Sequence, residues 1–236
     1  MNERKTEDGW QTAASAGTSG SAVASPVSPS ALSPPSSTLR FGAVILAAGA
    51  STRMGSPKQL LELRGKPLLV HAVEAALASP AWPVVVVLGA NAEKIRPVLA
   101  RLPVLITESP AWPEGMAASI RAGVTTLQQF SRKLDGALLA LCDQPAFSSE
   151  VIAQLLAAQS TTGRSIVAAR YGGHNGAPAL FLRQHFPELA ALTGEEGART
   201  LLNAHPADTA TVDLPALAVD LDTPEDFAGA RQNPWQ

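Results

Sequence analysis

The chain has 236 residues, of which 46% are hydrophobic and 16% charged, with a formal net charge of −2 and a sequence pI of about 6.1. A chain of this size can bury a substantial core, and its slightly acidic charge argues against a nucleic-acid-binding surface, which normally carries a basic excess. Its single cysteine, Cys142, excludes an internal disulfide and fits a reducing cytoplasm. The apolar runs are too short to cross a bilayer, and residues 4–5 lack a following apolar h-region, so we expect neither a membrane span nor a secretory signal.

The N-terminal segment differs sharply from the rest of the chain. Ser, Ala, Pro, Thr and Gly dominate residues 12–38, where large apolar side chains are nearly absent. Such a segment cannot bury enough apolar surface to offset the entropy lost on ordering. The composition therefore predicts a disordered extension over residues 1–39 and one folded domain over residues 40–236.

The pattern after residue 40 alternates between short apolar runs and amphipathic stretches. The first half predicts strands over 41–47, 84–88 and 104–106 and helices over 68–78, 92–99 and 115–129. The second half predicts strands over 137–141, 166–169, 179–181 and 218–221 and helices over 149–159, 184–191 and 197–204. Strands alternating with helices are typical of an α/β fold built on a mostly parallel sheet.

A loop rich in glycine, serine and arginine follows the first predicted strand, and residues 46–58 read LAAGASTRMGSPK. Ligands of open α/β sheets bind at the carboxyl ends of strands, where Gly49 and Gly55 let backbone amides approach phosphate oxygens. Arg53 and Lys58 supply positive charge for a triphosphate. The loop has neither the P-loop nor the GxGxxG spacing. An ordinary strand-to-helix turn with two solvated cations remains the alternative.

Two acidic strings come at the ends of predicted strands. In LCDQP, Asp143 is either a turn-forming residue or a carboxylate ligand of Mg²⁺, and Cys142 is more typical of core. In VDLDTPED, strand alternation puts Asp220 and Asp222 on one face, where two carboxylates can share a cation. A helix N-cap at Asp222, followed by proline, explains the same string.

Together with WPEGMAAS at 112–119 and GEEGAR at 194–199, these strings occur in the order of a known family. They resemble the MobA-like nucleotidyltransferases, and more narrowly the molybdenum cofactor cytidylyltransferases, over about residues 41–230. The resemblance implies a three-layer, Rossmann-like, mostly parallel sheet with helices on both faces, of the nucleotide-diphospho-sugar transferase type.

The resemblance also implies residue roles. Ala47, Ala48 and Gly49 would lie near base and ribose, and Gly115 and Ser119 beside the nucleotide. Arg53, Lys58 and Asp143 would form the catalytic set. Asp143 and Asp222, with Asp220 as the weaker candidate, would bind Mg²⁺. His174, Gly176, Pro178 and Arg199 would line the pterin side.

The sequence departs from the family pattern in YGGHNGAPALF at 171–181, which resembles an altered GxxGHPxxF. Ala177 stands where the family usually has His or Asn. His174 is alternatively a solvent-exposed loop residue, and Arg199 alternatively pairs with Glu195 across a helical turn. Ala48 stands where guanylyl relatives tend to carry a second glycine, which favours CTP.

The resemblance therefore implies a cytoplasmic, Mg²⁺-dependent transfer of CMP from CTP to a molybdopterin-type cofactor, releasing pyrophosphate. An acceptor molybdenum hydroxylase is a candidate partner, whereas nucleic acid and membrane are not expected. Two alternatives stay open within the fold family: an NAD(P)H-dependent oxidoreductase and a non-catalytic maturation factor for molybdenum hydroxylases. Pyrophosphate release, nicotinamide binding and pterin binding without turnover distinguish the three.

Overall fold

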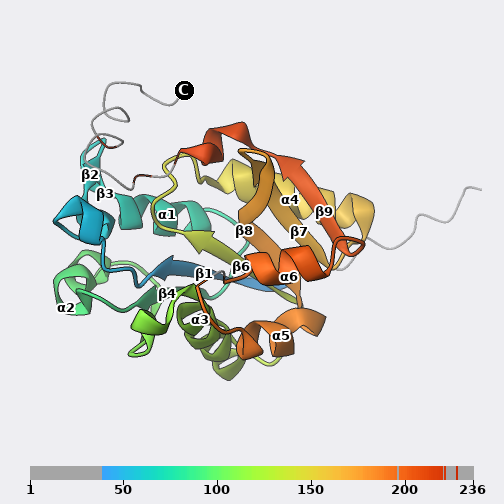
Figure 1. Cartoon of the computed structure of the whole chain (residues 1–236), viewed down its shortest axis with the longest axis horizontal. Coiled ribbons are helices and arrows are strands. Elements are labelled where there is room, and N and C mark those ends of the chain that lie inside the picture. Colours follow the sequence, from blue (N-terminus) through green and yellow to red (C-terminus); the bar gives the residue numbers. More distant parts are fainter. Residues whose placement is uncertain (1–38, 196, 220, 222–226, 228–236) are drawn as a thin grey trace, which may run out of the picture. The chain divides into compact units, whose positions relative to one another are not determined.

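A seven-stranded sheet forms the centre of the folded domain (Figure 1). The structure, a computed structural model, describes residues 39–195, 197–219, 221 and 227. The strand order is β5-β4-β1-β6-β8-β7-β9. The sheet strands are β1 (Phe41–Ala47), β4 (Val84–Leu88), β5 (Leu105–Glu108), β6 (Gly136–Leu141), β7 (Ile166–Tyr171), β8 (His174–Leu182) and β9 (Thr209–Asp213). A small antiparallel pair, β2 (Glu62–Leu63) and β3 (Lys66–Pro67), stands apart from it.

The sheet is mostly parallel, as the sequence predicts. β1 pairs in parallel with both β4 and β6, β4 with β5, and β7 with β9, while β8 runs antiparallel to β6 and β7. Every residue of β1 and β4 is buried. Continuous apolar strands of this kind are found where helices cover both faces of a sheet.

Helices cover both faces of this sheet (Figure 1). Alternate side chains of β1 divide between the faces, with Ile45 in the core beneath α1 and α4 and Val44 in the core beneath α3, α5 and α6. The structure therefore has the three layers that the sequence predicts. The α-helices are α1 (Leu68–Leu77), α2 (Ala92–Ile95), α3 (Met116–Phe130), α4 (Ser149–Thr162), α5 (Phe186–Ala191) and α6 (Arg199–Ala204). In the described part of the chain, none of the helices is both long and apolar enough to cross a bilayer.

Prolines shorten two of the predicted helices. The helix predicted over 92–99 is α2 followed by a 3-10 turn, Arg96–Leu99, because Pro97 has no N–H for an intrahelical bond. The helix predicted over 184–191 begins as a 3-10 turn, Arg183–His185, and becomes α5 just before Pro187. By contrast, α4 begins with a side-chain cap, since Ser148 Oγ accepts a hydrogen bond from the amide of Val151 at 3.4 Å.

The prediction of a strand over 218–221 is wrong for its described residues. Pro215–Ala218 form a 3-10 turn, and the edge strand is instead β9, which the sequence analysis missed. β9 reads TATVD and its residues are exposed or only partly buried, since it pairs with β7 alone. An edge strand with little apolar content lacks the continuous run that identifies the central strands.

Residues 172–173 form the turn of a β-hairpin rather than part of a longer loop. Gly172 and Gly173 have φ angles of 56° and 80°, and Tyr171 pairs with His174 directly across them. Two-residue hairpin turns of this type need positive φ at both central positions, which glycine adopts without strain. β8 therefore begins at His174, five residues earlier than the predicted strand at 179.

An ion pair between Arg40 and Asp135 connects the residues that precede β1 and β6. Arg40 donates from Nε and Nη2 to the two oxygens of Asp135, each at 3.0 Å. The Arg40 side chain holds the pKa of Asp135 below its ordinary value, chiefly through its hydrogen bond to the carboxylate. This contact lies at the amino ends of the two strands, whereas the loops that carry the candidate site leave their carboxyl ends.

Candidate functional site

Two cavities of about 350 Å³ each open beside one another at the carboxyl ends of β1 and β6. The first is bounded by the loop after β1, the 3-10 turn Trp112–Glu114 and the beginning of α3. The second is bounded by the hairpin of β7 and β8 and by α6. The two cavities have six lining residues in common: Leu46, Lys58, Met116, Leu141, Asp143 and Glu195. The shared wall makes them two halves of one cleft.

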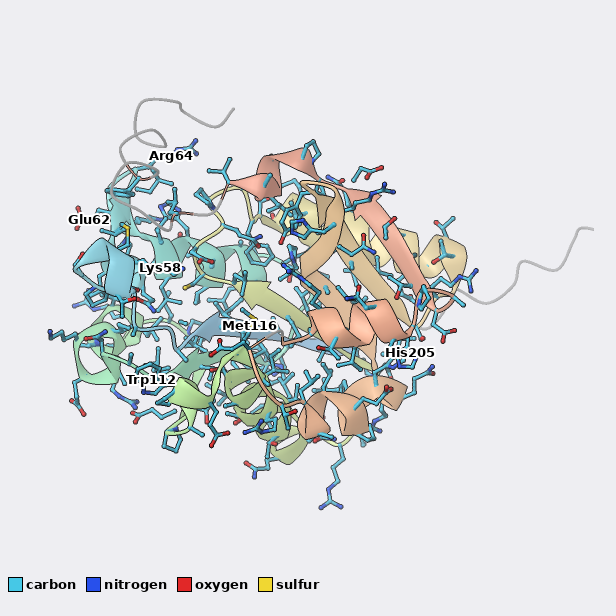
Figure 2. All side chains as sticks on the ribbon, viewed as in Figure 1. Lys58, Glu62, Arg64, Trp112, Met116 and His205 are labelled. Carbon is cyan, nitrogen blue, oxygen red and sulfur yellow. The ribbon has the colours of Figure 1, made fainter. Side chains whose placement is uncertain are left out.

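An ion pair lies in that shared wall. Lys58, at the start of a 3-10 turn after the glycine loop, donates from Nζ to Oδ2 of Asp143, which follows β6. Their side chains are 18% and 11% exposed. Figure 2 shows Lys58 and Met116 from segments far apart in the sequence. A cation and a carboxylate thus stand where both halves of the cleft can reach them.

The glycine loop is held in place by Gln59, which the sequence analysis did not single out. Gln59 is fully buried, and its Nε2 donates to the carbonyls of Ala47 at 3.0 Å and Gly49 at 2.9 Å. Ser51 adopts a left-handed conformation and its Oγ accepts from the amide of Lys58 at 3.0 Å. These bonds fix the loop backbone and the beginning of the turn that carries the Lys58 side chain.

All five residues predicted beside the nucleotide line the first cavity: Ala47, Ala48, Gly49, Gly115 and Ser119. Ile120 packs in the core, and Ser119 is buried in the wall of the first cavity. Met116, one helical turn before Ile120, is 40% exposed and lines both cavities.

The backbone amide of Gly115 is already hydrogen-bonded. The N–H of Gly115 donates to the carbonyl of Trp112 at 3.1 Å. The N–H of Ala117, in the first turn of α3, donates to the carbonyl of Gly194 at 3.3 Å. Gly115 instead allows close packing, because a Cβ there would lie 2.7 Å from the Gly194 carbonyl oxygen. This contact brings the segment of Glu195 against the beginning of α3.

Three of the four residues predicted for the pterin side line the second cavity: His174, Gly176 and Arg199. The fourth, Pro178, is buried within β8 and does not line it. The alternative that Arg199 pairs with Glu195 across a helical turn lacks its helix, because α6 begins only at Arg199. The Arg199 side chain is exposed at the mouth of this half of the cleft.

Gln144, from the LCDQP string, hydrogen-bonds two residues that line the second cavity, Tyr171 and Ala177. Its Nε2 donates to the hydroxyl of Tyr171 at 3.0 Å and to the Ala177 carbonyl at 3.2 Å, and Tyr171 in turn donates to that carbonyl at 2.8 Å. A Cβ at Gly176 would lie 2.6 Å from the Tyr171 hydroxyl oxygen. Gln144 and Gly176 therefore shape the hairpin beside the cleft, a function that the sequence pattern did not reveal.

Cys142 is a core residue, as predicted. Its side chain is 4% exposed within the cluster beneath α1 and α4, and burial raises the pKa of its thiol far above the ordinary value. A thiol with a raised pKa is a poor nucleophile at neutral pH.

Two described carboxylates, Asp143 and Glu195, line this wall, and Asp143 is the one that pairs with Lys58; carboxylate oxygens are the hard donors that Mg²⁺ prefers. The amide of Leu221 donates to the backbone carbonyl of Asp143 at 3.3 Å. The predicted ligands Asp220 and Asp222 are the sequence neighbours of Leu221, but both lie outside the described residues. The side chain of Arg53 is likewise outside them, although its backbone belongs to the 3-10 turn Thr52–Met54.

The comparison with protein families identifies the class of this protein. The fold is shared with solved structures, among them a nucleotidyl transferase from Methanothermobacter with a TM-score of 0.69 and 21% identity, which covers 82% of this chain and 96% of that one. Residues 43–210 match the model of the MobA-like NTP transferase domain. The chain therefore belongs to the MobA-like nucleotidyltransferase family.

Its relatives carry different names. Nicotine blue oxidoreductase of Paenarthrobacter nicotinovorans is 34% identical over 173 residues, covering 69% of this chain and 81% of the relative. The molybdenum cofactor guanylyltransferase of Vibrio cholerae is 27% identical over 192 residues, covering 78% and 88%. Among solved structures, Rv0371c from Mycobacterium tuberculosis in complex with manganese is 27% identical with a TM-score of 0.66, covering 82% of this chain and 99% of that one.

Proposed function

We propose that this protein transfers CMP from CTP to the phosphate of a molybdopterin-type cofactor in the cytoplasm, releasing pyrophosphate. The observation that carries the proposal is the ion pair of Lys58 and Asp143 in the wall shared by two cavities. A transferase must hold a nucleotide and an acceptor on either side of the phosphorus that is transferred. In this cleft the first cavity would hold CTP and the second the pterin.

The reaction forms one P–O bond and breaks another. An oxygen of the acceptor phosphate attacks the α-phosphorus of CTP, and the bond to the β-phosphate breaks as pyrophosphate leaves. A phosphate monoester is already an anion near neutral pH, so the site needs no strong general base. Catalysis then rests on bringing anions together and on neutralising charge on the phosphoryl oxygens.

The residues of the shared wall fit that task. Lys58 would bind phosphate oxygens, and Gln59 keeps the loop backbone that carries it in one conformation. Arg53 is proposed to bind the triphosphate from the same loop. Asp143, with Asp222 and Asp220 as its proposed partners, would hold Mg²⁺, which neutralises phosphate charge when bound. The hydrogen bond from Leu221 to Asp143 supports this pairing, because it joins the two acidic segments.

The base is proposed from resemblance to the cytidylyltransferases. Ala48 lines the first cavity at the position where guanylyl relatives tend to carry glycine. The relative in Vibrio cholerae is named a guanylyltransferase, so GTP is the necessary comparison. An acceptor molybdenum hydroxylase, to which the finished cofactor would be passed, is a further part of the proposal.

A second candidate function follows from the 34% identical relative named nicotine blue oxidoreductase. It requires hydride transfer from a nicotinamide cofactor to a heteroaromatic substrate. Hydride transfer does not require a carboxylate and a lysine between the two cavities, whereas phosphoryl transfer uses both. NAD(P)H oxidation that is independent of divalent cations and of Asp143 would favour it over the transferase.

The test is incubation of the protein with molybdenum cofactor, Mg²⁺ and each of the four NTPs, with pyrophosphate and dinucleotide measured together. We expect both products with CTP and a loss of both in Asp143→Asn. Asp135→Asn is the matched control, because Asp135 borders the opposite end of β6 and is remote from the cleft. Pterin binding without pyrophosphate from any nucleotide would contradict the proposal and indicate a maturation factor.

A further inference from the structure

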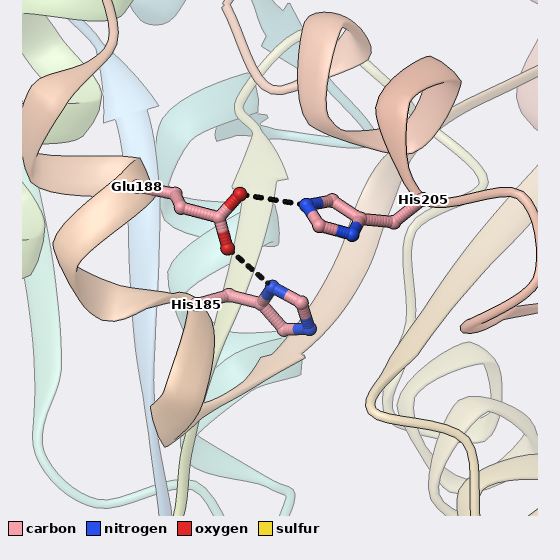
Figure 3. Close-up of side chains that lie close together, drawn as sticks. All are labelled: His185, Glu188 and His205. Atoms are coloured by element: carbon pink, nitrogen blue, oxygen red, sulfur yellow. Dashed lines mark hydrogen bonds and ion pairs between the residues drawn. The ribbon is translucent and has the colours of Figure 1, made fainter.

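A cluster of two histidines and a glutamate lies outside the cleft (Figure 3). Glu188 of α5 accepts from His185 Nδ1 at 2.9 Å through Oε1 and from His205 Nε2 at 2.6 Å through Oε2. One potential ligand atom from each of the three residues lies within 4.8 Å of the other two. His205 lies well away from Lys58 in Figure 2, so the cluster is separate from the proposed catalytic wall.

Each imidazole of the cluster also has a partner on its other ring nitrogen. His185 Nε2 is 2.9 Å from Ser165 Oγ, and His205 Nδ1 is 3.7 Å from Asp208 Oδ2. Histidines that ligate metals usually donate their second N–H to a carboxylate or another acceptor, which fixes the ring orientation. A serine hydroxyl both donates and accepts, so Ser165 can keep its bond whichever tautomer His185 adopts.

We propose that His185, Glu188 and His205 bind one divalent transition-metal ion of the Zn²⁺ class. Two imidazole nitrogens and one carboxylate oxygen are ligands that such ions prefer over the all-oxygen sets of Mg²⁺. With three protein ligands, water completes a tetrahedron. The site goes beyond the proposed transferase activity, since none of its three ligands lines either half of the cleft.

Side-chain movements of about 0.5–1.5 Å form this site. Ligand atoms at about 2.0–2.1 Å from a tetrahedral zinc ion lie roughly 3.3 Å apart, so the two hydrogen-bonded pairs must separate by about half an ångström. The widest pair of ligand atoms, which lies within 4.8 Å, must close by up to about 1.5 Å. His185 is 4% exposed and provides a fixed point, whereas the side chains of His205 and Glu188 are 27% and 43% exposed. Their exposure supplies both the room to adjust and a path for the ion.

The position of the site connects it to the second cavity. His205 directly follows α6, and α6 carries Arg199 and Leu202, which line that cavity. Glu188 belongs to α5, which packs against α3. A bound ion would therefore fasten α6 to α5 and stiffen one wall of the acceptor side of the cleft.

The test uses Co²⁺ alone as a spectroscopic probe of the full chain, freed of metal by a chelator and kept in excess Mg²⁺ to saturate the oxygen-ligand site. We expect one Co²⁺ per chain, with the intense visible absorption of a four-coordinate ion and a higher melting temperature. His205→Ala and the nearly isosteric Glu188→Gln should each weaken Co²⁺ binding at least tenfold. Ser165→Ala should weaken it about 10–100-fold, as the loss of an outer partner does.

Two further variants separate this site from others. His174→Ala removes an exposed histidine elsewhere, and Asp143→Asn removes the carboxylate of the cleft, and both should bind Co²⁺ as the wild type does. Failure of the wild type to bind Co²⁺ would overturn the proposal. So would undiminished binding by folded His205→Ala and Glu188→Gln. Neither outcome bears on nucleotide transfer, because the assay contains no nucleotide.

Discussion

Replacing Lys58 by methionine separates the catalytic function of this residue from its contribution to the fold. Methionine keeps the apolar stem and removes the charge. Loss of one hydrogen-bond donor that stabilises developing negative charge in a transition state costs about 10²–10³ in kcat, or about 2.7–4 kcal/mol, and we take this range for Lys58. The proposed role predicts a loss of turnover in this range, with a smaller change in the KM for CTP.

The same substitution should also destabilise the fold, because Asp143 loses this partner. Breaking a fully buried pair costs about 3–5 kcal/mol and losing an exposed pair about 0–1 kcal/mol. With side chains 18% and 11% exposed, the pair of Lys58 and Asp143 should fall between, at about 1–3 kcal/mol. Urea denaturation of the two proteins measures this difference in the free energy of unfolding.

Two further variants make the experiment decisive. Lys66→Met is the matched control, because Lys66 pairs with Glu74 at the surface, with side chains 52% and 42% exposed, and should lose little stability and no turnover. The double variant Lys58→Met/Asp143→Asn removes both charges and should recover stability while remaining inactive. If Lys58→Met turned over CTP at the wild-type rate, or if the double variant recovered activity, the proposed role of Lys58 would be wrong.

Three other predictions follow from the packing and the charges. Gly123→Ala should destabilise the protein by about 1–3 kcal/mol in urea denaturation, because its Cβ would lie 2.3 Å from Val44 Cγ1; unchanged stability would contradict the packing of α3 on β1. Cys142 should react with iodoacetamide far more slowly in the native protein than in urea, since burial raises the pKa of its thiol; equal rates would show that it is accessible. Asp135→Asn should lower the free energy of unfolding at neutral pH. Arg40 lowers the pKa of Asp135 in the folded state, so this stabilisation is complete above about pH 4 and is lost as the pH falls through the folded-state value. A difference between wild type and variant that did not shrink in acid would refute this assignment.

The central strands could be predicted from the sequence because their environment is uniform. β1 and β4 are covered on both faces, so a continuous apolar run identifies them, and the string that follows β1 predicts where a ligand binds. β9 could not be found in this way, because an edge strand with partly exposed residues has no such run. The short 3-10 turns after α2 and before α5 depend on single prolines.

The supporting residues of the cleft were harder to predict than the charged ones. Lys58 and Asp143 carry charges at strand ends, which is a recognisable pattern. Gln59 and Gln144 are uncharged polar residues whose importance comes from burial and from carbonyl groups far away in the sequence. Met116 packs against Gly197, where a Cβ would lie 2.9 Å from its sulfur, and this contact exists only in the folded chain.

Following the phosphorus atoms of CTP tests the central claim most directly. With CTP labelled at the α-phosphate, the wild-type protein, Mg²⁺ and molybdenum cofactor should yield a labelled pterin dinucleotide, whereas a γ-phosphate label should leave as pyrophosphate. Lys58→Met and Asp143→Asn should form neither product at a comparable rate. If the α-label never reached the pterin, or reached it equally well in both variants, the ion pair between the two cavities would not be the centre of a nucleotidyl transfer.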